Sequence, residues 1–221
     1  MPKLYSEWCF LVAAMFWTAG AHAAEGAGPV DRGTFVLSAE HLTGVVHDDL
    51  KSDGEKVGIT TIALFGYQAT TVFDMPRIAF DGFVIDGLSI GGSLAVFQAS
   101  LGVSGENSES YTDVLIAPRV GYAYLFSRSV GIWPRAGFSY WHRGFSDAAA
   151  STHAFAFDAD CPLVFFPAPH FAITVGPILD VTFGGSVTTD TVNVGGIGGV
   201  ATNQDISLLQ LGLSAGVAGF F

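Results

Sequence analysis

The sequence LQLGLSAGVAGFF, from Leu209 to Phe221, decides the fold of this chain. Every second residue in it is apolar, and the residues between are mostly small or polar. Alternation with a period of two predicts a β-strand whose two faces meet different surroundings. A strand of this kind that ends on an aromatic residue at the C-terminus is typical of a transmembrane β-barrel. The sequence therefore indicates an all-β membrane protein.

The composition agrees with a barrel that is exposed to lipid. Half of the 221 residues are hydrophobic, the mean hydropathy is +0.46, and there are 28 glycines and 19 phenylalanines. Beyond the N-terminal leader, glycines, prolines and charges interrupt every apolar run before it reaches the roughly 20 residues that a spanning helix needs. These features leave either a large soluble core or a closed barrel, which is the sheet that can span lipid.

The first 23 residues are interpreted as a cleavable signal peptide. Lys3 supplies the positive charge, the apolar core runs from Phe10 to Trp17, and Ala21-His22-Ala23 is the small-residue site after which we expect cleavage. A retained anchor helix is the alternative, although this apolar core is shorter than a spanning helix. Residues 24–32 are then a short periplasmic segment, and residues 33–221 form the barrel.

Eight alternating segments are separated by turns of two kinds. Short turns follow the second, fourth and sixth segments, and Asp86-Gly87 is the strongest hairpin signal among them. Longer polar loops follow the others, beginning with His47 to Lys56. This asymmetry is typical of outer-membrane barrels, and it predicts an eight-stranded antiparallel up-and-down barrel with both ends in the periplasm. The strands are expected at about 33–46, 75–85, 88–101, 112–126, 130–143, 153–166, 171–187 and after residue 205.

Two features conflict with regular spanning strands. The segment Val57 to Phe65 is strand-like, yet a ninth spanning strand would break the topology. We interpret it as part of the first outer loop or as an extension of the second strand above the membrane. Proline removes a donor from the ladder, so its presence in a central strand requires a bulge or a strand end. The prolines inside predicted strands are Pro118, Pro134, Pro162 and Pro177.

A motif of proline, arginine, any residue, a small residue and an aromatic occurs at Pro76–Phe80, Pro118–Tyr122 and Pro134–Phe138. Alternation directs each aromatic toward lipid and each arginine inward, and an outward charge at mid-bilayer would cost about 2–4 kcal/mol. An eight-stranded lumen is just wide enough for side chains to fill. Inward carboxylates of the same parity would therefore pair with the arginines and plug it. The predicted network consists of Glu40, Arg77, Asp81, Arg119, Arg135, Asp158, Asp160 and Asp180.

Other chemistry is weakly supported. The net charge of −11 and the scattered basic residues argue against a nucleic-acid partner, and much of the acid, including Asp48 and Asp49, falls in expected outer loops. The histidines lack the spacing of metal ligands. Ser139 and His142 could be placed in a lipid hydrolase site, but nothing around them is specific. Cys161 is expected on the lipid face. We therefore predict no catalytic residues, metal or cofactor.

Aromatic residues gather near the expected strand ends, as the interfacial girdles of a barrel require. A soluble barrel would instead place such rings inward and its charges outward. The expected periplasmic girdle contains Phe126, Trp133, Phe165, Phe166, Phe171 and Phe221, and Tyr140 and Trp141 lie toward the outside.

Two hairpins carry a family resemblance: FVIDGLSIGGSL from Phe83 to Leu94, and APRVGYAYLFSRSVGIWPRAGFSY from Ala117 to Tyr140. With the signal peptide and the terminal Phe221, they resemble the small outer-membrane β-barrel superfamily, such as the eight-stranded OmpA-type domain and the OmpX class. The similarity covers about residues 33–221. It implies outer-membrane lipid and lipopolysaccharide as surroundings, and the barrel-assembly machinery as a partner of the last strand.

What the resemblance implies about activity is less specific. Members of the superfamily include structural proteins, adhesins and a few lipid-modifying enzymes, whose motifs are not visible here. We expect a structural or surface-interaction role in the outer membrane of a Gram-negative cell, with variable outer loops. A narrow pore or ion path through the charged lumen is the main alternative, followed by an outer-leaflet lipid enzyme and a secreted soluble barrel. No ligand is indicated.

Overall fold

The computed structural model describes residues 28–52, 55–63, 73, 75–101, 109–145, 150–190 and 201–221. Throughout these ranges the regular structure is β-sheet, and they contain no helix of the length and apolar character needed to cross a membrane. The predicted signal peptide lies outside the described residues. The predicted periplasmic segment is described from Gly28 onward.

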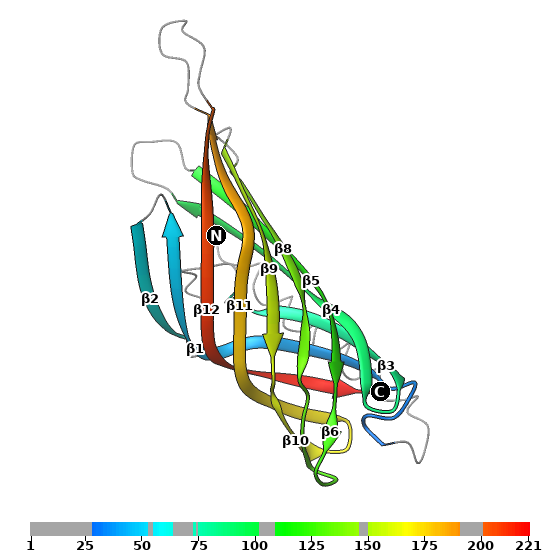
Figure 1. Cartoon of the computed structure of the whole chain (residues 1–221). Coiled ribbons are helices and arrows are strands. Elements are labelled where there is room, and N and C mark those ends of the chain that lie inside the picture. Colours follow the sequence, from blue (N-terminus) through cyan, green and yellow to red (C-terminus); the bar gives the residue numbers. More distant parts are fainter. Residues whose placement is uncertain are drawn as a thin grey trace, which may run out of the picture.

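The described strands form one closed antiparallel barrel of eight columns (Figure 1). Four columns are single strands, and the other four are each built from two shorter strands. The barrel closes because β12 pairs with β11 on one side and with β1 on the other. The strands are β1 (Phe35–Ser52), β2 (Glu55–Ala63), β3 (Arg77–Ile85), β4 (Leu88–Leu101), β5 (Glu109–Tyr122), β6 (Tyr124–Leu125), β7 (Val130–Ile132), β8 (Arg135–Phe145), β9 (Ala150–Asp160), β10 (Leu163–Ala168), β11 (Phe171–Asp190) and β12 (Ala201–Phe220).

Prolines lie at the breaks of two of the four divided columns. Pro134 and Pro162 lie in the breaks between β7 and β8 and between β9 and β10. The break residues still bond to their neighbours, since Trp133 N–H donates to the carbonyl of Pro162 at 2.9 Å. Pro118 and Pro177 stay inside β5 and β11, where each has a register partner on one side only. Strand ends and one-sided pairing thus reconcile proline with the barrel.

The segment that would have made a ninth strand occupies part of the second column. β1 pairs with β3 from Phe35 to Glu40, and with β2 from Gly44 to Ser52. β2 therefore continues the β3 column along the other half of β1, which is the second of the two predicted interpretations. The exchange of partners coincides with a bulge in β1, where His41 adopts a positive φ of 54°.

Two predicted outer loops, His47 to Lys56 and Thr188 to Asp205, are wrong in part, because strands continue into them. The expected loop His47 to Lys56 is the paired end of the β1–β2 hairpin, and β11 and β12 extend to Asp190 and from Ala201. These extensions form the tall end of the barrel in Figure 1, which we call the long-strand end. The opposite end, with the turns Asp86–Gly87 and Pro169–His170, is the short-turn end.

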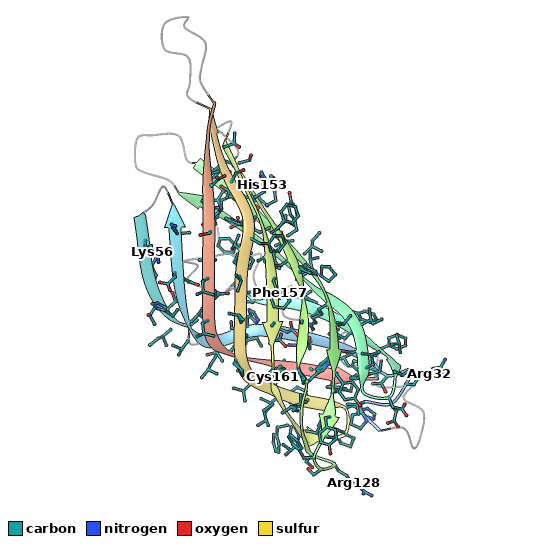
Figure 2. All side chains as sticks on the ribbon, viewed as in Figure 1. Arg32, Lys56, Arg128, His153, Phe157 and Cys161 are labelled. Carbon is teal, nitrogen blue, oxygen red and sulfur yellow. The ribbon has the colours of Figure 1, made fainter. Side chains whose placement is uncertain are left out.

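The outer wall is apolar and the inner wall carries the charge. Large hydrophobic side chains are exposed on the outer face of every column, for example Phe80, Phe138 and Leu211. Figure 2 shows Phe157 and Cys161 on this wall, in keeping with the expected place of the cysteine on the lipid face. Such an extended apolar exterior is stable in hydrocarbon and not in water.

Some residues lie on a different side of the wall from the one predicted. Trp133 and Phe166, expected in a girdle, are buried in the interior, and Trp141 also turns inward. Asp48, expected in an exposed loop, is fully buried in β1. Each of these residues is an even number of positions away from other inward-facing residues of its column, and it therefore faces inward too. The sequence prediction did not apply this alternation near the strand ends.

Candidate functional site

The interior of the short-turn end is closed by an apolar floor. Trp133 is completely buried, its ring stacks on Phe83 at a centroid distance of 5.7 Å, and it contacts Phe220 at 6.1 Å. Its indole N–H donates to Ser89 Oγ at 3.0 Å. The N-terminal segment packs Val30 against this cluster, and its carbonyl accepts a hydrogen bond from Gly87 N–H. The floor consists of Val36, Phe83, Ala123, Trp133, Val164, Phe166, Ala172, Ala218 and Phe220.

Immediately inside the floor, five charged groups form one connected network. Glu40 accepts two hydrogen bonds from Arg119, at 2.7 and 2.8 Å, and a third from Arg135 at 2.6 Å. Arg119 also holds Asp81, with nitrogen–oxygen distances of 3.1 and 2.6 Å. Arg135 holds Asp160 at 2.7 and 2.9 Å. Both arginines thus use their guanidinium groups as two-sided forks, which is the strong geometry for carboxylate binding.

Glycines make room for these long side chains. Asp81 pairs with Gly91, Gly91 with Arg119, Arg119 with Gly137 and Gly137 with Asp158, along one row across five columns. A Cβ on Gly137 would meet the carbonyl oxygen of Pro118 and lie 2.9 Å from Arg119 Cα. The wall therefore alternates large charged residues with glycine, which lets the charges mesh in a narrow lumen.

The remaining three predicted residues lie beside the network. Arg77 donates to the carbonyl of Phe73 at 2.8 Å. Arg77, Asp158 and Asp180 line a cavity of about 10 Å³, which is room for about one water molecule. Among the described residues, Asp158 Oδ2 and Arg77 Nε have no hydrogen-bond partner, so a water there would satisfy them. Nowhere in these ranges do three or more histidine, cysteine, aspartate or glutamate groups lie close enough to hold a metal ion.

The long-strand half of the lumen is filled differently. Phe73 and Met75, which lie outside any strand, are buried among apolar wall residues such as Leu115 and Leu208. The carbonyl of Phe73 also lies 3.2 Å from the ring Nδ1 of His41.

A second, smaller ion pair lies in the same half. Asp113 accepts from Arg143 at 2.7 and 2.8 Å and from the indole of Trp141 at 3.0 Å. The sequence prediction missed this pair and the buried Asp48–Gln210 hydrogen bond of 3.0 Å. The alternation of inward and outward positions along each strand is the signal that could have revealed the Asp113–Arg143 pair and the Asp48–Gln210 hydrogen bond.

The candidate hydrolase pairing of Ser139 and His142 is separated by the wall. Ser139 is buried on the inner face of β8, whereas His142 is exposed on the outer face. Residues an odd number apart on a strand point to opposite faces of the sheet. The two side chains therefore cannot act on the same substrate atom.

Comparisons with known proteins agree with this architecture. The chain is similar to the solved structure of OprG, an outer membrane protein of Pseudomonas aeruginosa, at 9% identity over 88% of this chain and 99% of that one, with a TM-score of 0.54. It is also similar to the outer membrane protein AlkL solved in lipid bilayers, at 16% identity over 90% and 95% of the two chains, with a TM-score of 0.51. No protein-family model and no curated protein matches the chain.

At such low identity the likeness shows the fold alone. That fold is the eight-stranded outer-membrane β-barrel, and the apolar outer wall is the surface such a barrel presents to lipid. The chain is thus an integral β-barrel protein of the outer membrane type.

Proposed function

We propose that this protein is a non-conducting outer-membrane barrel that holds its extended strands at the cell surface for structural or interaction roles. The connected network of Glu40, Arg119, Arg135, Asp81 and Asp160 carries this proposal. All five side chains are at least four-fifths buried, and each charge has an opposite partner within hydrogen-bond distance. A paired, desolvated network of this kind is a seal rather than a path, because a passing ion would have to break it.

The apolar floor argues against the alternative of an ion path. Even if water occupied the cavity beside Arg77, ions would still have to cross the packed rings of Phe83, Trp133 and Phe220. The stack of Arg135 over Trp133, at 4.7 Å to the ring centre, joins the floor to the charge network. Two consecutive barriers, one apolar and one ionic, support a closed lumen.

Orientation and partners follow from the same setting. In barrels of this type the tight turns face the periplasm and the longer connections face outward. We therefore assign the short-turn end to the periplasm and the long-strand end to the cell surface.

The C-terminal residue pairs with the first strand of the barrel, since Phe221 and Phe35 exchange two backbone hydrogen bonds of 2.8 Å. This position suits recognition of the C-terminal strand by the barrel-assembly machinery. A separate observation, that Ser139 and His142 lie on opposite faces of β8, favours a non-enzymatic role.

Planar-bilayer recording tests the proposal. Purified, refolded protein is expected to give no steady channels, and the Phe73→Ala variant is expected to be equally silent because the floor and the charge network remain. Folding is checked in the same samples by the difference in gel mobility before and after boiling. Steady, reproducible conductance of the wild type would overturn the sealed-lumen proposal.

Epitope labelling tests the orientation. An epitope inserted between Asp53 and Gly54 and detected on intact cells would support the assigned orientation, and detection only after lysis would refute it.

A further inference from the structure

The basic residues of the chain are distributed unevenly over its surface. Of the nine lysines and arginines, Lys3 lies outside the described residues and four arginines line the lumen. Arg32 and Arg128 are exposed at the short-turn end, where Figure 2 labels them. Within the described part of the chain, the exposed cations of the long-strand end are therefore Lys51 and Lys56. The lumen arginines are Arg77, Arg119, Arg135 and Arg143.

These two lysines lie directly opposite each other on one face of a hairpin. Lys51 of β1 is the register partner of Lys56 of β2, and both side chains are exposed on the outer face. Figure 2 shows Lys56 on β2 at the other end of the barrel from Arg32 and Arg128. Side chains in this relation have Cβ atoms about 4.5–5.5 Å apart, and like charges there destabilise the strand pair. An anion placed between the two ammonium groups would turn this repulsion into attraction.

The pair lies at the height where the wall changes from apolar to polar. On β12, next to β1, Leu213, Leu211 and Leu209 are exposed in succession on the outer face. Lys51 pairs with Ser207, the next outward residue above Leu209. Lysine side chains at such a border extend their charge into the headgroup layer while their stems cover apolar surface.

The neighbouring polar groups leave the lysines available. Asp49, the outward carboxylate below Lys51, lies 3.7 Å from His47 Nε2, and His47 Nδ1 lies 2.8 Å from Thr60 Oγ1. No ion pair within 4.0 Å joins either lysine to a carboxylate whose side chain the structure describes. Asp49 nevertheless opposes an incoming anion, which makes it a sensitive control.

We propose that Lys51 and Lys56 together bind a phosphate group on the headgroup of an outer-leaflet lipid, namely lipopolysaccharide. This inference rests on the orientation assigned under the proposed function, because only the outer leaflet presents that lipid to the long-strand end. The two lysines lie on the outer face, level with Ser207, which is the next outward residue beyond the exposed Leu209. This position at the edge of the apolar wall favours a headgroup phosphate over a soluble anion. The site would anchor the first hairpin of the barrel to the membrane surface.

Native mass spectrometry of the folded barrel in a zwitterionic detergent tests the site, with purified diphosphoryl lipid A as the probe. The variant Lys51→Gln/Lys56→Gln is expected to bind the probe about tenfold more weakly than the wild type, because two charge-assisted contacts are lost. Asp49→Asn is expected to bind it more tightly. Arg128→Gln, which removes an exposed cation at the opposite end, is the matched control and is expected to bind like the wild type.

Several outcomes would overturn the inference. Equal lipid A binding by the double-lysine variant and the wild type would show that the pair is not the site. A lysine-dependent stabilisation by inorganic phosphate that is as strong as that by lipid A would show a general anion site instead. Each variant is expected to fold, because these exposed residues contribute little to the stability of the barrel. The boiling-dependent gel shift verifies this. Conductance is recorded separately, so a conducting barrel that still binds lipid A through the lysines would refute the sealed lumen and leave this inference standing.

Discussion

The two halves of the lumen are filled by different parts of the chain. At the short-turn end, the floor and the charge network come almost entirely from inward residues of the wall. At the long-strand end, Phe73 and Met75 fill the space from outside any strand, beside the Asp113–Arg143 pair. The comparison teaches that inward residues of alternating strands account for the first half, whereas the second also depends on Phe73 and Met75, which belong to no strand.

The largest expected effect of a single substitution is in the charge network. Glu40→Gln removes the carboxylate that neutralises both Arg119 and Arg135, and it leaves buried charge that is under-compensated. Breaking a buried ion pair in this way costs about 3–5 kcal/mol. Urea unfolding of the barrel in lipid vesicles should show this loss. A change below about 1 kcal/mol would mean that water already reaches the network.

The glycine row provides the next effect. Gly137→Ala places a Cβ against the carbonyl of Pro118 and the backbone of Arg119, so the unfolding free energy should fall by about 3 kcal/mol. Gly184→Ala is the matched control, because a Cβ there meets no atom within 4 Å and should change stability by less than about 0.5 kcal/mol. Similar losses in the two variants would contradict the close meshing of charge and glycine.

The ion pair of the long-strand half should matter less. Asp113→Asn weakens the bonds to Arg143 and Trp141, but Arg143 is about a quarter exposed and can regain water. We expect a loss of about 1–2 kcal/mol, less than for Glu40→Gln. The same urea titration measures both variants. An equal or larger loss at Asp113 would reverse the contrast between the two halves.

The smallest effect is expected on the outer wall. Cys161→Ser replaces a half-buried thiol that faces lipid, in a break between strands, by a group of similar size. The unfolding free energy should stay within about 0.5 kcal/mol of the wild type. A loss of several kcal/mol would indicate that the thiol is packed inside the barrel rather than against its exterior.

Much of the barrel could be predicted from alternation. The predicted strand 88–101 coincides with β4, and the eight predicted lumen residues line the interior because a period of two leaves no freedom about which face they share. The alternation of apolar and polar residues no longer identifies a strand beyond the membrane, because both faces of a strand can be polar there. The sequence therefore predicts a loop where the ends of β1 and β2 pair, although Asp53-Gly54 is the same hairpin signal as Asp86-Gly87.

Other parts of the lumen could not be predicted in full. Phe73 and Met75 continue the inward parity of Arg77 and Ala79, but they belong to no strand, so the sequence pattern does not show that they fill the barrel. Trp133 keeps the inward parity of its column, although its place beside Pro134 near a strand end favours an interfacial girdle when the sequence is considered alone. Packing against distant parts of the wall decides that these side chains fill the interior.

Solid-state NMR of the isotope-labelled barrel in lipid bilayers tests the central claim most directly, through nitrogen–carbon contacts of the arginine side chains. The guanidinium groups of Arg119 and Arg135 are predicted to show contacts to the carboxyl carbons of Glu40, Asp81 and Asp160. Guanidinium contacts to lipid phosphorus or to bulk water, with none to these carboxylates, would contradict an ionic interior enclosed by an apolar wall.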